Sequence, residues 1–401
     1  MCSNSLTNYK IWHKIVLIKT LLSEIMEFIP RTIENQVKEK LFKGKLVIIY
    51  GARRTGKTTL VKNILSGYPH EGKYYDCESI MVEHGLSERD PDKIRTFLGN
   101  HKLVVLDEAQ NIPDIGRILK LMVDTYPEIQ IIATGSSSFD LAQKISEPMT
   151  GRTFTFILYP LSLAEIKSHK DMLFVESKLE NILRFGSYPS IFDLSEDDIR
   201  IELGEIVSKY LYKDVLNFEG LRKSATIKNL LRLLALQLGN EVSYTELSTQ
   251  LGISRLTVQK YIDILEQSFV VFHLEAFARN RRKEISKSIK IYFYDLGVRN
   301  SLVENYNRME IRNDAGALWE NFCIVERMKS NAAARRSVNF YFWRTYDKKE
   351  IDYVEEGDGK ITGFEFKWNS RKPYYPPQEF VKGYSAAVEK IDRSNYWKFL
   401  I

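Results

Sequence analysis

Continuous apolar runs alternate with segments of helical periodicity over the first part of the chain. In chain order, the predicted strands and helices cover residues 46–50, 57–65, 73–79, 102–106, 115–127 and 129–138. Strands that are buried on both faces read as unbroken apolar runs, and their alternation with helices indicates a parallel sheet. We therefore expect an α/β domain over residues 26–165, with helices on both faces of its sheet.

The periodicity changes after this domain. Helical spacing dominates residues 176–238, and residues 242–274 then read as two short helices joined by a glycine-containing turn. Ser243 and Ser254 stand where these two helices each need an N-cap. Apolar runs on either side of a basic tip would supply wing strands. The pattern therefore predicts a helical and winged-helix region over residues 166–291.

This middle region offers two surfaces to a nucleic acid. The second predicted helix, residues 254–266, exposes Arg255, Thr257, Gln259 and Lys260. The predicted wing strands, 269–277 and 289–296, flank a basic tip at 278–290. A helix-turn-helix of this kind is used by many proteins to read DNA. Because acidic side chains also lie on the second helix, a lid or an interaction module stays open as an alternative.

A third pattern begins near Tyr292. A helix around residues 319–328 precedes short strands in which apolar and polar residues alternate. These strands cover residues 339–345, 350–356 and 361–369. A helix followed by several alternating strands predicts a separate α+β domain over residues 292–401.

The segment "YGARRTGKTTL", residues 50–60, follows the first predicted strand directly and opens a helix. Its spacing, Gly51-x-x-x-x-Gly56-Lys57-Thr58, is the P-loop pattern, in which backbone N–H groups surround phosphate oxygens. Lys57 would neutralise the β- and γ-phosphates, and Thr58 would ligate Mg²⁺. The predicted nucleotide-binding residues are Gly51, Arg54, Thr55, Gly56, Lys57, Thr58 and Thr59. No Asn-Lys-x-Asp guanine motif occurs, so ATP with Mg²⁺ is the expected ligand.

Acidic and small polar residues end two of the other predicted strands. Asp107 is predicted to hold Mg²⁺, directly or through water, and Glu108 to polarise the attacking water. Ser136 ends a strand that should lie beside the P-loop strand, where it could contact the γ-phosphate; an ordinary turn is the alternative. Arg152 follows that strand and could stabilise charge on the transferred phosphoryl group. A surface or ion-paired arginine is an equal alternative for Arg152.

The third block carries its own set of charged residues. Glu320 lies on the predicted helix, Asp352 in one strand, and Glu365 and Lys367 on the same face of the next strand. This pattern resembles the core of PD-(D/E)XK nucleases, in which carboxylates hold Mg²⁺ and the lysine orients a water for phosphodiester attack. The alternative is a small antiparallel sheet with a solvent-exposed charged face.

Composition adds few constraints. The 401 residues carry a formal net charge of +6, which is compatible with a nucleic-acid partner without requiring one. Three scattered cysteines form no Cys-x-x-Cys pair, so neither a zinc site nor a disulfide framework is suggested. The apolar segment 11–29 contains too many charges for a membrane span. We therefore expect a cytoplasmic protein without a membrane partner.

Several stretches together resemble a large group of prokaryotic AAA-type ATPases with an uncharacterised C-terminal domain. The matching stretches are "GARRTGKTTL", "VVLDEAQNIPDI", "IIATGSSS", "GRTFTFILYPLSLAEI", "RFGSYPSI", "YLYKDV", "YFYDLGVRN", "LWENF" and "EIDYV…GFEFKWN". The resemblance implies an ATP-binding protein, with Ser136 as sensor and Arg152 as the arginine finger. Similar chains begin near Met26, so residues 1–25 are interpreted as an upstream extension.

Three hypotheses about function follow. The first is an Mg²⁺-dependent ATPase that acts on DNA or is regulated by it. The second is an ATP-gated interaction switch, whose C-terminal block binds a partner without cleaving nucleic acid. The third is a DNA-binding regulator with little turnover. A homo-oligomer or a protein partner is compatible with each of them.

Overall fold

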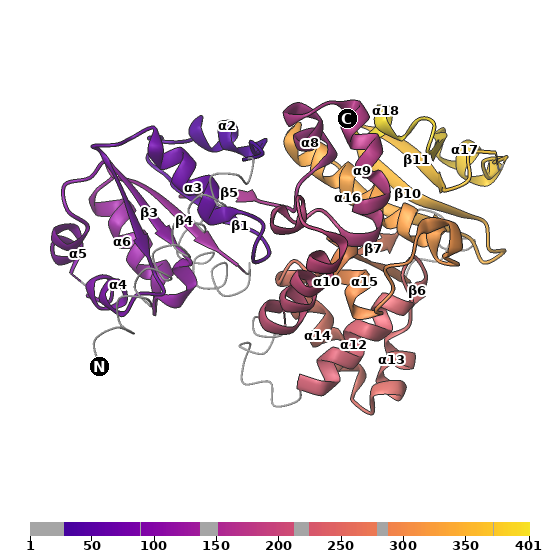
Figure 1. Cartoon of the computed structure of the whole chain (residues 1–401), viewed down its shortest axis with the longest axis horizontal. Helices are drawn as coiled ribbons and strands as arrows, with labels where there is room; N and C mark the ends of the chain where they lie inside the picture. Colours follow the sequence, from indigo (N-terminus) through magenta and orange to yellow (C-terminus); the bar gives the residue numbers. More distant parts are fainter. Residues whose placement is uncertain (1–27, 89, 137–150, 212–223, 279–287, 372) are drawn as a thin grey trace, which may run out of the picture. The chain divides into compact units, whose positions relative to one another are not determined.

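The computed structural model describes residues 28–88, 90–136, 151–211, 224–278, 288–371 and 373–401 (Figure 1). The predictions about residues 1–25 lie outside these ranges, as does most of the basic tip at 278–290. The strands of the described residues form two sheets, one near each end of the chain.

The first sheet is entirely parallel and has the strand order β2-β3-β4-β1-β5. Its strands are β1 (Leu46–Tyr50), β2 (Gly72–Asp76), β3 (Leu103–Asp107), β4 (Gln130–Gly135) and β5 (Thr153–Ile157). The unbroken apolar runs are fully buried in β1, β3 and β4. The predicted α/β domain with a parallel sheet is confirmed, and β4 lies between β1 and β3 as expected of a strand beside the P-loop strand.

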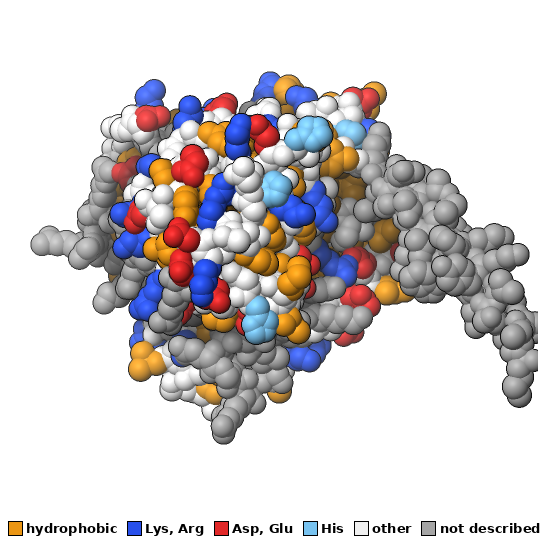
Figure 2. All heavy atoms as spheres, turned by 90° about the vertical axis from the view of Figure 1, so that its left-hand side faces the viewer, with side chains coloured by type: hydrophobic (Ala, Val, Ile, Leu, Met, Phe, Trp, Pro, Cys, Tyr) orange, Lys and Arg blue, Asp and Glu red, His pale blue; other side chains and the backbone are white. Residues whose placement is uncertain are grey.

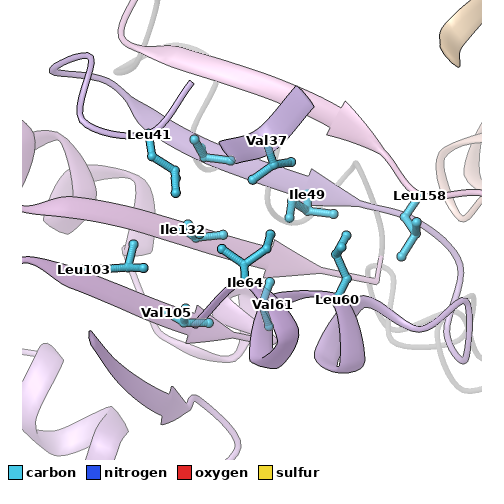
Figure 3. Packing of buried hydrophobic residues seen from close by; sticks show 11 residues of the cluster. Val37, Leu41, Ile49, Leu60, Val61, Ile64, Leu103, Val105, Ile132 and Leu158 are labelled. Atoms are coloured by element: carbon cyan, nitrogen blue, oxygen red, sulfur yellow. The ribbon is translucent and has the colours of Figure 1, made fainter. Parts of the chain in front are cut away.

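The helices of this domain pack around the sheet. They are α2 (Ile33–Lys38), α3 (Lys57–Ser66), α4 (Ile80–Leu86), α5 (Pro91–Leu98), η1 (Ala109–Asn111) and α6 (Ile115–Thr125). Helix α3 contacts β2, β3 and β4 directly. In Figure 3, side chains of α2 and α3 point toward those of β1, β3 and β4 and form one apolar core. Leu60, Val61 and Ile64 follow the spacing of one helix face and are completely buried there. This packing fixes the first turn of α3 against the strand ends.

The middle of the chain is helical. Its helices are α8 (Leu163–His169), α9 (Met172–Phe185), η2 (Pro189–Ile191), α10 (Glu196–Glu205), η3 (Ile206–Leu211), α12 (Ser224–Leu236), α13 (Tyr244–Leu251), α14 (Arg255–Gln267), α15 (Leu296–Leu302) and η4 (Met309–Ile311). Ser243 and Ser254 cap α13 and α14, because their hydroxyl oxygens accept the N–H groups of Glu246 at 3.3 Å and Thr257 at 3.1 Å. No helix of the described residues is long and apolar enough to cross a membrane.

The second sheet has the order β12-β11-β10-β9-β7-β8-β6. Its strands are β6 (Glu241–Val242), β7 (Val271–Ala276), β8 (Ile289–Phe293), β9 (Asn339–Arg344), β10 (Glu350–Gly357), β11 (Lys360–Lys367) and β12 (Ala387–Asp392). The strands interpreted as wing strands, β7 and β8, pair antiparallel, and β7 also pairs parallel with β9. The boundary expected between residues 291 and 292 therefore falls inside β8, within a continuous sheet.

The C-terminal part contains α16 (Ala315–Ala333), α17 (Gln378–Tyr384) and α18 (Tyr396–Leu400). In chain order, α16 precedes the antiparallel strands β9, β10 and β11, and α17 precedes β12, which pairs parallel with β11. Helix α16 packs against β11. At this strand Arg327 and Trp319 of α16 lie against the rings of Phe364 and Trp368, which alternate with Glu365. Asp352 and Glu365 are nevertheless buried, so the alternative of a solvent-exposed charged face is wrong for these two carboxylates.

Candidate functional site

The loop between β1 and α3 needs glycine at two positions. Gly51 has φ +156°, and a Cβ atom there would lie 2.3 Å from the carbonyl oxygen of Leu158. Gly56 has φ +95° in the left-handed region and is the N-cap of α3. The chain can therefore leave a fully buried strand and turn directly into a helix. The resulting loop and helix N-terminus form an anion-binding concavity.

Lys57 is the cation of this loop. Its side chain is buried, and Nζ donates hydrogen bonds to the carbonyl oxygens of Gly51 at 2.9 Å and Ala52 at 3.0 Å. A phosphate oxygen is a stronger acceptor for an ammonium group than a carbonyl oxygen, because the bond is then charge-assisted on both sides. Lys57 is therefore placed to exchange loop carbonyls for phosphate oxygens.

Asp107 lies at the centre of a hydrogen-bond network at the carboxyl edge of the sheet. Its Oδ2 atom accepts from the hydroxyl of Thr58 at 2.6 Å and from the hydroxyl of Tyr74 at 2.7 Å. Its Oδ1 atom accepts from the hydroxyl of Thr134. A carboxylate and a hydroxyl oxygen are suitable ligands for a hard cation that also keeps waters and binds phosphate. Thr58 and Asp107 thus fit the Mg²⁺ predicted from the sequence.

Glu108 is held in a less common backbone conformation next to this network. Its φ is +53°, and its N–H group donates to the hydroxyl of Thr134 at 3.0 Å. Its Oε2 atom accepts from Nε2 of Gln110 at 2.5 Å, and the same nitrogen lies 3.2 Å from Oγ of Ser136. A non-glycine residue in the left-handed region is often found at functional sites. The structure thus joins Glu108 and Ser136 through Gln110.

The remaining predicted loop residues have other surroundings. Arg54 forms an ion pair with Glu202 of α10. The carbonyl oxygen of Thr55 accepts from Nη1 of Arg31 at 2.6 Å, while the side chain of Thr59 is exposed. Arg31 is itself buried and paired with Glu165, so it ties the loop to the start of α8.

Arg152 lies at the opposite edge of the sheet from the loop. Its carbonyl oxygen accepts from the N–H of Leu46, at the start of β1, whereas the loop follows Tyr50 at the end of that strand. Four residues of a strand span roughly 13 Å. The Arg152 side chain is 42% exposed, and its Nε atom is paired with Asp124 at 2.8 Å. Because β5 is parallel to β1, both strands start at the same edge of the sheet, which lies away from the loop. Arg152, directly before β5, is therefore too far from the loop to act at the nucleotide of its own chain.

Sequence reasoning missed Tyr74, Gln110, Thr134 and Arg31. Burial and the hydrogen bond to Asp107 raise the pKa of the Tyr74 hydroxyl far above its usual value, so it stays a donor to the carboxylate. For Thr134 the sequence offered one signal, because it is a polar residue in a mostly apolar strand. Gln110 lies two residues after Glu108, so its contact is local, whereas Tyr74 and Arg31 reach the site from segments that are distant in the chain.

The four predicted C-terminal residues come together around β10 and β11. Glu320 accepts from the hydroxyl of Tyr292 at 2.5 Å, and Asp352 accepts from the N–H of Phe366 at 2.8 Å. Glu365 and Lys367 form an ion pair. Burial, followed by the charges of Glu320 and Glu365, raises the pKa of the Asp352 carboxyl well above its usual range. The three carboxylates are therefore close enough to disfavour each other's charge.

Residues 43–167 match the family described as "AAA domain". This part of the chain is similar to AAA domains. Residues 176–308 match "Domain of unknown function (DUF8612)", and residues 315–394 match "Domain of unknown function (DUF4143)". The match to DUF8612 extends past β8, and β8 belongs to the same sheet as the C-terminal strands β9 to β12.

Relatives along most of the chain are uncharacterised. Uncharacterized protein Rv2008c of Mycobacterium tuberculosis is 28% identical over 339 residues, which cover 84% of this chain and 73% of that protein. Uncharacterized protein MJ1544 of Methanocaldococcus jannaschii is 24% identical over 369 residues, covering 86% and 80%. An uncharacterized protein of Haemophilus influenzae is 22% identical over 326 residues, covering 77% and 78%.

Solved structures resemble the chain more distantly. The RuvB Holliday junction branch migration motor of Thermotoga maritima is 16% identical with a TM-score of 0.32, covering 62% of this chain and 91% of that chain. The Pif1 helicase of Candida albicans is 17% identical with a TM-score of 0.26, covering 44% and 47%. Scores this low do not establish a shared fold.

The hydrogen bond from Tyr74 to Asp107 leads to a prediction for the AAA domain. In Tyr74→Phe, half-maximal ATP hydrolysis should need roughly tenfold more Mg²⁺, the typical effect of losing a group that orients a metal-binding carboxylate. Tyr75→Phe is the matched control, because the Tyr75 hydroxyl donates to the carbonyl of Leu98 at 2.8 Å instead. Equal Mg²⁺ midpoints for the two variants and the parent would show that Tyr74 does not orient Asp107 during turnover.

Proposed function

We propose that the chain binds ATP with Mg²⁺ at the loop between β1 and α3 and hydrolyses it. The observation that carries this proposal is the hydrogen bond of 2.6 Å between Thr58 and Asp107, with Glu108 next to it. Thr58 of the P-loop and Asp107 at the end of β3 are thus in contact, although β4 lies between β1 and β3 in the sheet. The backbone of the loop and Lys57 would hold the phosphates, and Glu108 would polarise the attacking water.

The test of this proposal is the rate of phosphate release from ATP in the presence and absence of Mg²⁺. We expect Mg²⁺-dependent release at about 10⁻⁴ to 10⁻² s⁻¹ or faster, the range of P-loop NTPases that act without an activating partner. If ATP binds but is not hydrolysed with any divalent cation, the interaction-switch hypothesis takes first place. If ATP does not bind, the assignment of the loop itself fails.

DNA is the macromolecular partner that the middle region favours. The order α12, β6, α13, α14, β7, β8, with β6 and β7 on either side of β8, supports the winged-helix interpretation. Helix α14 exposes Arg255 and Lys260 for phosphate or base contacts. By contrast, Figure 2 shows interspersed basic and acidic side chains on the face that carries α4, α5 and α6. We therefore place the DNA contact on α14 and not on that face.

A double variant tests this placement. Arg255→Ala with Lys260→Ala should weaken DNA binding and reduce the slope of log K against log [salt] by roughly 2, since two phosphate contacts are lost. Lys93→Ala with Lys382→Ala removes the same charge from exposed positions on α5 and α17. A salt slope that changes equally in both double variants would count against a DNA contact on α14.

Two observations support alternatives for the other parts. The order α16, β9, β10, β11, α17, β12 supports a nuclease-like fold for the C-terminal block, within which a binding role without cleavage fits the interaction switch. Arg152 lies at the far edge of the first sheet, β2-β3-β4-β1-β5. There it could serve as an arginine finger only for a second copy of the chain. Mass measurement of the protein with an ATP analogue tests that role, which requires a homo-oligomer. A monomer under those conditions would leave Arg152 as a surface residue.

A further inference from the structure

A buried lysine lies inside the C-terminal carboxylate cluster. Lys290 of β8 is 2% exposed, and its Nζ atom lies 3.2 Å from Oε1 of Glu320 on α16. It forms a second ion pair with Glu350 of β10. The same nitrogen lies 5.4 Å from the centre of the Phe342 ring on β9. Carboxylates and an aromatic face from three elements thus enclose one ammonium group.

The strand that carries Lys290 supplies a second contact to the same acid. Lys290 and Tyr292 are two residues apart in β8, so their side chains leave the strand on one face. Both contact Glu320, since the hydroxyl of Tyr292 donates to its Oε1 atom at 2.5 Å. Glu320 is therefore held by β8 from the middle region, although it is predicted to be part of the C-terminal site.

Each carboxylate that a PD-(D/E)XK nuclease would use for its metal already has a partner here. Glu320 is held by Lys290 and Tyr292, and Glu365 is paired with Lys367 through Oε1, while its buried Oε2 atom accepts no hydrogen bond from the described residues. Asp352 accepts a backbone N–H group at 2.8 Å. Among the described residues, no group of three or more His, Cys, Asp or Glu side chains is arranged to hold a metal ion. Unlike Asp107, whose partners are neutral hydroxyl groups, Glu320 already has a buried ammonium group 3.2 Å away, and this charge would repel a divalent cation at the same carboxylate. The residues present therefore do not fit the divalent cation that the nuclease resemblance implies.

We propose that Lys290 is the built-in cation of this cluster and takes the place of a divalent metal ion. Its buried ammonium group neutralises the half-buried Glu320 and, together with Arg344, Glu350, so that these two acids do not repel each other. The cluster then joins β8 to α16 and β10 as a permanent ion-pair centre. The C-terminal block accordingly acts as a metal-independent binding domain and does not cleave DNA.

The wild-type protein gives the first test, in the absence of nucleotide. Melting temperature is measured against Mn²⁺ and Mg²⁺ concentration for the full chain and for Asp352→Asn. We expect the same response in both proteins, because neither cation enters the cluster. Any cation effect at Thr58 and Asp107 is common to both and cancels in the comparison. A metal-induced rise that Asp352→Asn removes would overturn the proposal.

A Lys290 variant gives the second test. Lys290→Met should lower the melting temperature by roughly 5 °C or more, because Glu320 would lose the ammonium group that pairs with it and keep the hydroxyl of Tyr292 as a partner. Mn²⁺ should restore part of this loss, and Lys290→Met with Asp352→Asn should lose that restoration. A folded Lys290→Met protein that shows no Mn²⁺ response would argue against the cation role. If Lys290→Met does not fold, Lys290→Arg should fold, because it keeps the charge.

Nicking of supercoiled plasmid with Mn²⁺ completes the experiment. The wild-type protein should leave the plasmid intact over the time in which ATP hydrolysis is readily measured. Cleavage that is lost in Asp352→Asn would show a working metal site and overturn the proposal. This outcome is independent of ATP hydrolysis, so the failure of one proposal does not imply the failure of the other.

Discussion

Replacement of Lys57 by alanine is expected to weaken ATP binding by roughly 10²-fold. Lys57 is buried in the P-loop, and its ammonium group now donates to the carbonyl oxygens of Gly51 and Ala52. A hydrogen bond from a charged donor contributes up to about 3 kcal/mol, which corresponds to a factor on the order of 10² in affinity. The loop N–H groups would remain, so some phosphate binding should persist.

Calorimetric titration with a non-hydrolysable ATP analogue measures this effect. Lys93→Ala is the control, because Lys93 is an exposed lysine on α5 of the same domain, paired with Glu88 at 3.3 Å. Melting curves of both variants establish that the AAA domain is still folded. An unchanged dissociation constant in a folded Lys57→Ala protein would refute the assignment of this loop as the nucleotide site.

The P-loop could be recognised from the sequence because its determinants are local. A buried strand, two glycines and the start of a helix follow one another within residues 46–58, and each is visible as a residue type or a period. The caps of α13 and α14 are local in the same sense, since Ser243 and Ser254 bond to residues three positions further on. Predictions of this kind need no knowledge of how distant segments pair.

The partners of Asp107 and Glu108 depend on strand order, which the residues of one strand do not reveal. Tyr74 reaches Asp107 because β2 pairs with β3, and Thr134 does so because β4 pairs with β3 on the other side. Arg152 shows the opposite error. It follows a strand in the sequence, but it precedes β5, and parallel pairing with β1 places it at the far edge of the sheet.

The sequence could not predict that the middle and C-terminal parts share one sheet, for a related reason. The apolar pattern of β7 predicts a strand but does not say which strands lie on its two edges. Its parallel pairing with β9 joins segments that are more than 60 residues apart in the chain. Helix α16 in turn packs on β8 and brings Glu320 to Lys290. A lysine in an apolar strand could therefore not be recognised as part of the C-terminal cluster.

Replacement of Glu108 by glutamine is expected to leave ATP binding intact and to slow hydrolysis by roughly 10²-fold or more. An amide has nearly the size of the carboxylate and can still bond to Gln110, so the fold of the strand end should be preserved. It cannot take a proton from water, however. The left-handed backbone of Glu108, held by Thr134, aims this side chain at one place, and few other groups could replace it.

Single-turnover hydrolysis and ATP affinity, measured on the same preparation, separate the two effects. Glu128→Gln is the control, because Glu128 is an exposed acid in the turn before β4 and undergoes the same chemical change. If Glu108→Gln hydrolyses ATP at the rate of Glu128→Gln, another group activates the water. A loss of affinity without a loss of rate would instead place Glu108 among the groups that bind the nucleotide. A loss of rate alone agrees with a base that acts only on the attacking water, because in the proposed site ATP and Mg²⁺ would be bound by Lys57, Thr58 and Asp107.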